Sequence, residues 1–166
     1  GLALLLCGAA LMLGLLVSAA GGARQVAGPL RYCIASGGVI AAAAILEFVW
    51  SSRQMPPATD DFQPYYDLLF WGGGHVLQFV HVQIMMVCWL LLIVSLREAG
   101  MPHHLRNDVF LYALFSVGLA VALLTPLPYL LYNIDSGEHR LFFTRLMTWA
   151  GAVAPAILGL LLLPPL

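Results

Sequence analysis

The sequence predicts an all-α fold: a polytopic membrane helix bundle with five transmembrane helices. Hydrophobic residues make up 61% of the 166 residues, charged residues only 9%, and the mean hydropathy is +0.92. Soluble domains carry roughly 25% charged residues. The apolar runs are continuous rather than alternating, and a bilayer cannot hydrogen-bond a bare backbone, so helices rather than strands are the expected spanning elements.

Glycine and proline separate the first two expected helices. Residues 2–20 form an apolar run, and the glycines of the following GGARQVAGP segment end it. Pro29 suits a first helical turn, because proline has no N–H and its φ is already helical. The second helix is therefore expected over 30–50, before the polar, proline-rich stretch SSRQMPPATDDFQPYYD.

The remaining three expected helices also end at polar segments. Residues 68–96 contain no Asp, Glu, Lys or Arg, and this run is longer than the roughly 20 residues that cross a bilayer. REAGMPHHLRND follows it, and Asp108 is a candidate N-cap for a helix over 109–132. NIDSGEHR leads into the fifth helix, over 144–163. We expect residues 1–166 to form one bundle and, because both ends lie in apolar runs, to be part of a longer polytopic subunit.

The charges orient the bundle and limit its partners. The net charge of −1 gives no indication of nucleic-acid binding. We therefore expect the lipid bilayer and the remaining helices of the same subunit as partners, in the inner membrane of a bacterium. Positive residues favour the cytoplasmic side, which places the loops after the first and third helices there, because they carry four of the seven basic residues: Arg24, Arg31, Arg97 and Arg106.

The stretch FWGGGHVLQFVHVQ, residues 70–83, places histidines and glutamines where hydrocarbon should surround them. An ionisable side chain at that depth costs free energy unless it faces a protein interior, a metal or a cofactor, so it marks a functional hypothesis. At the helical period, His75 shares a face with Gln78, whereas His81 points elsewhere. His75 is expected either to make an interhelical hydrogen bond or to contact a metal or cofactor.

Three consecutive glycines precede this histidine, and each costs roughly 1 kcal/mol in a helix interior relative to alanine. Two gains would offset that cost: close approach of another helix, or room for a bulky planar cofactor. The glycines are Gly72, Gly73 and Gly74.

Two further ionisable residues have open roles. Glu47, near the end of the second helix, is expected either to reach the interface or to belong to a proton path. His139, between Glu138 and Arg140, is expected in a surface cluster of the last loop.

The stretch DLLFWGGGHVLQF resembles the sixth transmembrane helix of subunit I of the heme-copper oxidases, the family of cytochrome c oxidase subunit I. In that helix, an aromatic-rich start followed by Gly-His supplies one imidazole to the copper beside the high-spin heme. The resemblance implies that His75 is a copper ligand, that Gly72, Gly73 and Gly74 give the heme space, and that Gln78 hydrogen-bonds near the site. The five helices would correspond to helices four to eight, and the heme-ligating histidines to helices outside this chain.

The sequence also departs from the family pattern. The other two copper imidazoles of the family are an adjacent pair near the end of the next helix, where this chain has Leu130 and Leu131. His103 and His104 are adjacent, but they are expected on the opposite side of the membrane from His75. The resemblance therefore implies a copper site without its paired histidines.

The resemblance implies that the full-length subunit reduces oxygen or nitric oxide at a buried heme and metal centre of a respiratory chain. Cytochrome c or a quinol would donate the electrons, and accessory subunits would bind. Two alternatives remain: a non-catalytic heme-binding or sensory relative that has lost the copper site, and a cofactor-free transporter with a polar site near the bilayer centre. Heme and copper content distinguishes the three.

Overall fold

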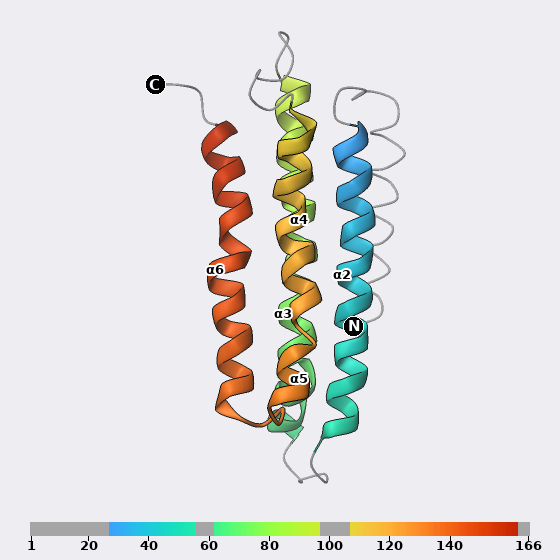
Figure 1. The fold of residues 1–166 in the computed structure, drawn as a ribbon, viewed down its shortest axis with the longest axis vertical. Helices are drawn as coiled ribbons and strands as arrows, with labels where there is room; N and C mark the ends of the chain where they lie inside the picture. Colours follow the sequence, from blue (N-terminus) through green and yellow to red (C-terminus); the bar gives the residue numbers. More distant parts are fainter. Residues whose placement is uncertain (1–26, 56–61, 97–106, 163–166) are drawn as a thin grey trace.

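The computed structural model describes residues 27–55, 62–96 and 107–162, and nearly all of them are helical (Figure 1). The expected helix over 2–20 and the pair His103 and His104 lie outside these residues, and the described part contains no strand. The described helices are α2 (Ala27–Gln54), α3 (Phe62–Leu96), α4 (Asp108–Leu124), α5 (Leu127–Leu131) and α6 (Gly137–Leu162).

Four stretches of the described chain are long and apolar enough to cross a membrane. Each exceeds the roughly 20 residues that a helix needs to span the hydrocarbon core. The predicted class, an all-α membrane bundle, is confirmed with four spans in the described part, and it places the chain among integral membrane proteins. The spans are Gly28–Gln54, Pro64–Leu92, Asp108–Leu131 and Gly137–Leu162.

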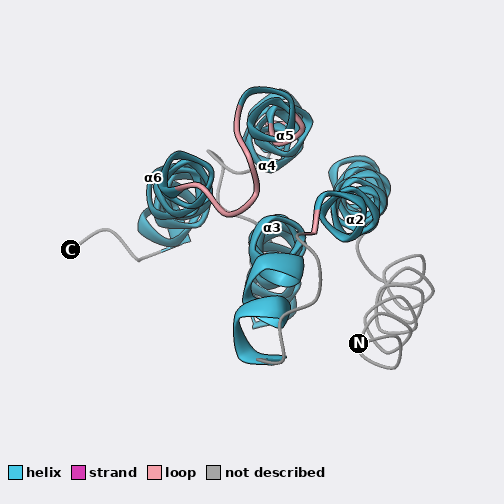
Figure 2. Ribbon diagram, turned by 90° about the horizontal axis from the view of Figure 1, so that it is seen from below, coloured by secondary structure: helices cyan, strands magenta, loops and turns pink. Residues whose placement is uncertain are grey.

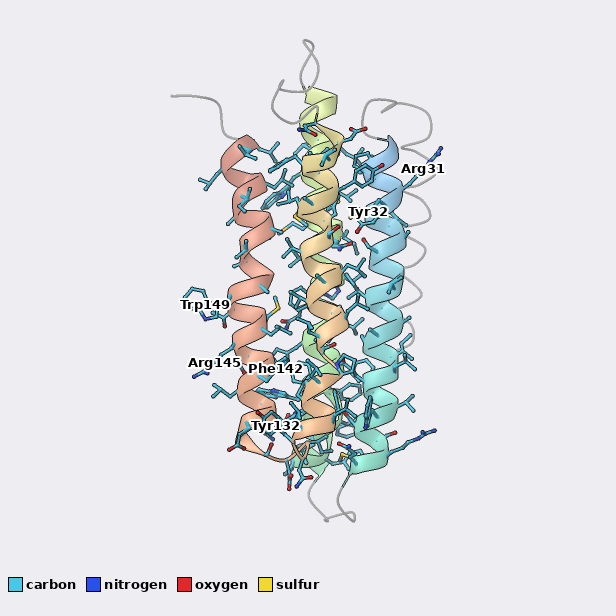
Figure 3. All side chains as sticks on the ribbon, in the orientation of Figure 1. Arg31, Tyr32, Tyr132, Phe142, Arg145 and Trp149 are labelled. Carbon is cyan, nitrogen blue, oxygen red and sulfur yellow. The ribbon has the colours of Figure 1, made fainter. Side chains whose placement is uncertain are left out.

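Viewed along the helix axes, the four long helices stand at the corners of a quadrilateral (Figure 2). α2 and α6 occupy opposite corners, and each packs against both α3 and α4. One hydrophobic cluster forms around Phe115, and a second forms around Phe79 and Phe143. Arg145 and Trp149 project from α6 away from the other helices (Figure 3).

Three helices extend beyond their expected ends. α2 continues to Gln54 and α3 begins at Phe62, so parts of the polar stretch between them are helical. α6 begins at Gly137 rather than at 144, because the Ser136 hydroxyl accepts a hydrogen bond from the His139 N–H at 3.2 Å and caps the first turn. Composition marks the end of an apolar run, whereas capping groups decide where the backbone leaves the helix.

The expected continuous helix over 109–132 is wrong, because the helix breaks after Leu124. Pro126 has no N–H to donate to the carbonyl oxygen of Ala122, four residues earlier. That oxygen instead accepts a hydrogen bond from the Thr125 N–H at 3.4 Å and lies 2.6 Å from the Thr125 hydroxyl oxygen.

The start of α4 is capped one residue earlier than expected. Asn107, rather than Asp108, is the N-cap, and its Oδ1 accepts hydrogen bonds from the Val109 N–H at 3.0 Å and the Phe110 N–H at 3.4 Å. Asp108 lies in the first turn, where a negative charge complements the positive end of the helix dipole.

Two of the three consecutive glycines lie at close contacts. A Cβ on Gly73 would lie 2.7 Å from the carbonyl oxygen of Ala44 on α2, and a Cβ on Gly72 would collide with the Tyr129 hydroxyl. A Cβ on Gly74 would meet no described atom within 4 Å. Small residues let helix backbones approach in lipid, so tight packing accounts for Gly72 and Gly73.

Buried polar side chains tie α2, α3 and α4 together inside the span. Gln83 on α3 is 1% exposed; its Nε2 donates to the Phe115 carbonyl oxygen at 2.9 Å, and its Oε1 accepts from the Ser36 hydroxyl at 3.0 Å. The hydroxyl oxygens of Tyr32 and Ser116 lie 2.5 Å apart and join α2 to α4. Interhelical hydrogen bonds contribute roughly 0.6 kcal/mol on average in membrane proteins, so this network stabilises the bundle modestly.

We expect Gly73→Ala to destabilise the bundle and Gly74→Ala to be tolerated. The first substitution forces α2 and α3 apart, and overpacking costs roughly 1–3 kcal/mol. The second adds a methyl group in open space, and alanine in a helix is favoured over glycine by up to about 1 kcal/mol. Thermal unfolding of the purified full-length protein in detergent, followed by circular dichroism, measures both. Equal changes in Tm would contradict the close contact at Gly73.

Candidate functional site

His75 lies on α3 within a membrane span and is half-buried. Its Nδ1 lies 2.5 Å from the carbonyl oxygen of Trp71, one turn earlier, which fits an Nδ1–H donor. In that tautomer, Nε2 keeps the lone pair that a metal or a hydrogen-bond donor needs. The imidazole centroid lies 5.0 Å from the Trp71 ring and 6.2 Å from the Phe143 ring of α6, so the side chain lies among aromatic rings.

Gln78 does not share this environment. Gln78 and His81 are exposed on the described bundle, whereas Phe79 on the predicted face of His75 is buried. Gly74 is one turn before Gln78 and therefore lies on the same side of α3. The structure thus brings His75 toward α6 and leaves Gln78 and His81 on the outside of the described helices.

The described residues contain no group of three or more His, Cys, Asp or Glu side chains that could hold a metal ion. Leu130 and Leu131 stand where the resemblance would place paired histidines, and each is 67% exposed on α5. These positions therefore point away from the interior of the bundle that His75 borders.

A separate set of polar side chains lies between α2, the break from α4 to α5, and α6. Each of its five members is at most 3% exposed. Two members lie one turn apart on α2, and two others lie four residues apart, one in the helix break and one on α5. The set therefore has two levels along the bundle axis. We call it the buried polar cluster: Glu47, Ser51, Thr125, Tyr129 and His139.

The first level of the cluster pairs Glu47 with Thr125. The Thr125 hydroxyl forms a hydrogen bond with Glu47 Oε1, whereas Glu47 Oε2 has no partner among the described residues. Glu47 is 1% exposed, so the expectation that it reaches the interface is wrong. Ionisable side chains are rare inside membrane spans, and those that occur there mark candidate functional sites.

The second level centres on Tyr129. Its hydroxyl oxygen lies 2.9 Å from that of Ser51, and its ring stacks on Trp50 with centroids 5.4 Å apart. The His139 ring meets the Tyr129 ring edge-on, with centroids 4.8 Å apart and an angle of 80°. One phenol therefore links α2, α5 and α6.

His139 is buried, so its expected place in a surface cluster is wrong. The residue is 0% exposed, and neither ring nitrogen has a hydrogen-bond partner among the described residues. Its neighbour Arg140 lies over the Trp71 ring at 5.0 Å, and the Arg140 carbonyl oxygen accepts a hydrogen bond from Trp71 Nε1–H at 3.3 Å. The i, i+4 spacing of His139 and the buried Phe143 is the sequence signal for this burial, once the helix is known to start at Gly137.

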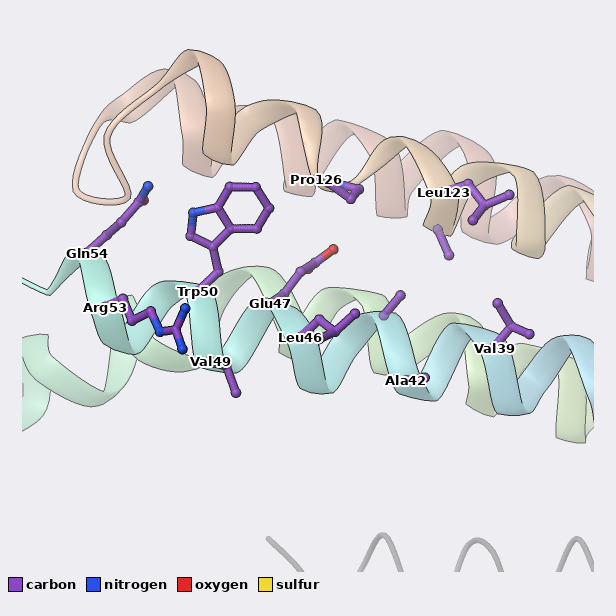
Figure 4. A pocket seen from close by; sticks show the side chains of 12 residues that line it. Val39, Ala42, Leu46, Glu47, Val49, Trp50, Arg53, Gln54, Leu123 and Pro126 are labelled. Carbon is purple, nitrogen blue, oxygen red and sulfur yellow. The ribbon is translucent and has the colours of Figure 1, made fainter.

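An apolar groove of about 680 Å³ runs between α2 and α4 beside the cluster (Figure 4). Glu47 and Pro126 contribute to its lining, and Arg53 and Gln54 lie at one end. Several lining residues, including Leu46 and Leu123, are exposed on the described bundle, so the groove faces the outside of the described helices.

We expect His139→Phe to be tolerated and His139→Ala to be destabilising. Phenylalanine keeps the ring contacts and removes two buried nitrogens that lack partners, which is neutral or favourable. Alanine leaves a cavity, and loss of a buried ring costs on the order of 3 kcal/mol. Unfolding of both variants in the same detergent checks this. A loss in the phenylalanine variant as large as that in the alanine variant would show that the nitrogens bind a partner.

No family model and no solved structure matches this chain. Among curated proteins, the chain is similar to an uncharacterized protein of Rickettsia prowazekii (strain Madrid E), with 31% identity over 122 residues. The match covers 68% of this chain and 23% of the relative. The chain thus spans about a quarter of the length of the curated relative that it matches.

Proposed function

We propose that this chain is the central part of a heme-copper-oxidase-like subunit I that reduces oxygen or nitric oxide at a buried heme and metal centre. The full-length subunit would lie in a bacterial inner membrane. Cytochrome c or a quinol would supply its electrons, and accessory subunits would complete it.

The placement of His75 carries the proposal. The imidazole lies within a membrane span, half-buried between α3 and α6, and the Trp71 carbonyl oxygen fixes its Nδ1 at 2.5 Å. A fixed second nitrogen orients a ligating histidine and makes the other nitrogen a better donor. This geometry suits a ligand or a positioning group beside a buried redox centre.

Heme, when bound, would supply one-electron chemistry and a site for the gas. Its ligating histidines would come from helices outside this chain. Gly74 faces open space and Gln78 is exposed, which leaves one side of α3 next to His75 clear of described atoms. Gly72 and Gly73 pack on protein, so the room for a flat macrocycle would lie at Gly74.

Copper fits the described residues poorly. A three-imidazole site needs two more histidines near His75, and Leu130 and Leu131 occupy the corresponding positions with exposed side chains. No step is therefore assigned to copper. This mismatch favours a second candidate function, a heme-binding or sensory relative without copper chemistry.

We expect His75→Ala to change the heme spectrum or metal content of the purified full-length protein far more than His81→Ala does. His75 is turned toward α6, whereas His81 is exposed on the described bundle and serves as the matched control. Optical spectra and metal analysis of the native protein and both variants provide the measurement.

The outcomes separate the candidates. Heme with copper supports the oxidase-like function, and heme without copper supports the second candidate. Negligible effects of both substitutions would reduce His75 to a packing residue. A colourless native protein would leave a transporter as the better hypothesis.

A further inference from the structure

The environment of Glu47 points to a positively charged ligand. Its carboxyl group is inside a membrane span, 1% exposed, and Oε2 has no hydrogen-bond partner among the described residues. Leaving a buried acceptor unpaired is costly, and leaving a buried carboxylate uncompensated costs more. A bound cation or a proton would compensate the negative charge.

The break between α4 and α5 adds negative electrostatic potential near Glu47. Pro126 and Pro128 have no N–H, so neither can donate to the carbonyl oxygens of Ala122 and Leu124, four residues earlier. At the carboxyl end of α4, the Ala122 carbonyl oxygen accepts a long hydrogen bond of 3.4 Å from the Thr125 N–H, and helix C-termini favour positive charge. Broken helices in membrane transporters bind sodium ions or protons with similar groups.

A count of the hydrogens at Thr125 favours a proton as the ligand. The Thr125 hydroxyl has one proton but contacts two acceptors, Glu47 Oε1 and the Ala122 carbonyl oxygen, the latter at 2.6 Å. If that proton is donated to Ala122, the contact with Glu47 needs a proton from the carboxyl group. Both hydrogen bonds are then satisfied by a neutral Glu47.

We propose that Glu47 is a reversible proton-binding site inside the membrane, with Thr125 as its positioning residue. Among the described residues, Arg53 lies at the end of the same groove on α2, Tyr129 on α5 lies one level along the cluster, and His139 on α6 lies against the Tyr129 ring. Ser51 and Tyr129 lie one turn along and form the next level of hydroxyl groups, toward His139. This proposal does not depend on a heme or on the oxidase-like function.

Dicyclohexylcarbodiimide tests the proposal, because this lipid-soluble reagent attacks protonated carboxyl groups. In native membranes containing the full-length protein, we expect an adduct on Glu47 that falls as the pH rises. At neutral pH it should exceed the adduct on Glu138, because the reagent partitions into lipid and Glu138 is exposed in the first turn of α6. Mass spectrometry of the digested protein locates and quantifies both adducts.

Two variants and one spectrum complete the test. Glu47→Gln should abolish the adduct on the α2 peptide, while Glu138→Gln should leave it unchanged. Infrared spectra of the purified protein in H2O and D2O should show the C=O stretching band of a protonated carboxyl group, and this band should be missing in Glu47→Gln. Protection of Glu47 by sodium ions but not by potassium ions would overturn the proposal in favour of a sodium site. Absence of both the adduct and the band would overturn it outright.

Discussion

The bundle depends on satisfying polar groups without water. Inside the span, each buried polar atom needs a partner from the protein, and most of the described ones find it across a helix interface. Gln83 on α3 bonds to α2 and α4, and the Thr125 hydroxyl forms a hydrogen bond with Glu47 on α2. Against this background, the unpartnered atoms of Glu47 and His139 stand out. These are buried polar atoms for which the described residues provide no hydrogen-bond partner.

The two candidate sites are neighbours, because the ring of Phe143 lies near both of them. His75 approaches Phe143, whose ring lies 5.0 Å from that of His139 in the buried polar cluster. Trp71 Nε1–H donates a hydrogen bond to the carbonyl oxygen of Arg140 on α6. The ring of Phe143 therefore connects the surroundings of His75 with the buried polar cluster.

The sequence predicts the fold class because a long continuous apolar run crosses a bilayer as a helix, which satisfies its own backbone hydrogen bonds. It predicts the spans less well where local chemistry intervenes. The apolar run around Pro126 predicts one continuous helix, but the helix breaks there. The polar segment around Ser136 predicts a loop, but Ser136 caps the first turn of α6. The partner of Glu47 is 78 residues away along the chain, so no local pattern indicates that its carboxyl group is buried. The face of His75 is predicted from the helical period, but the exposure of Gln78 depends on where the neighbouring helices pack.

Tyr129 contacts several helices at this end of the bundle. Its hydroxyl reaches Ser51 and lies against Gly72, its backbone carbonyl accepts from Gln54 at 3.3 Å, and its ring touches His139. α5 is only five residues long and carries this tyrosine between two breaks in the backbone. Because one side chain makes these contacts, a rotation of α5 would break its contacts with α2, α3 and α6 together.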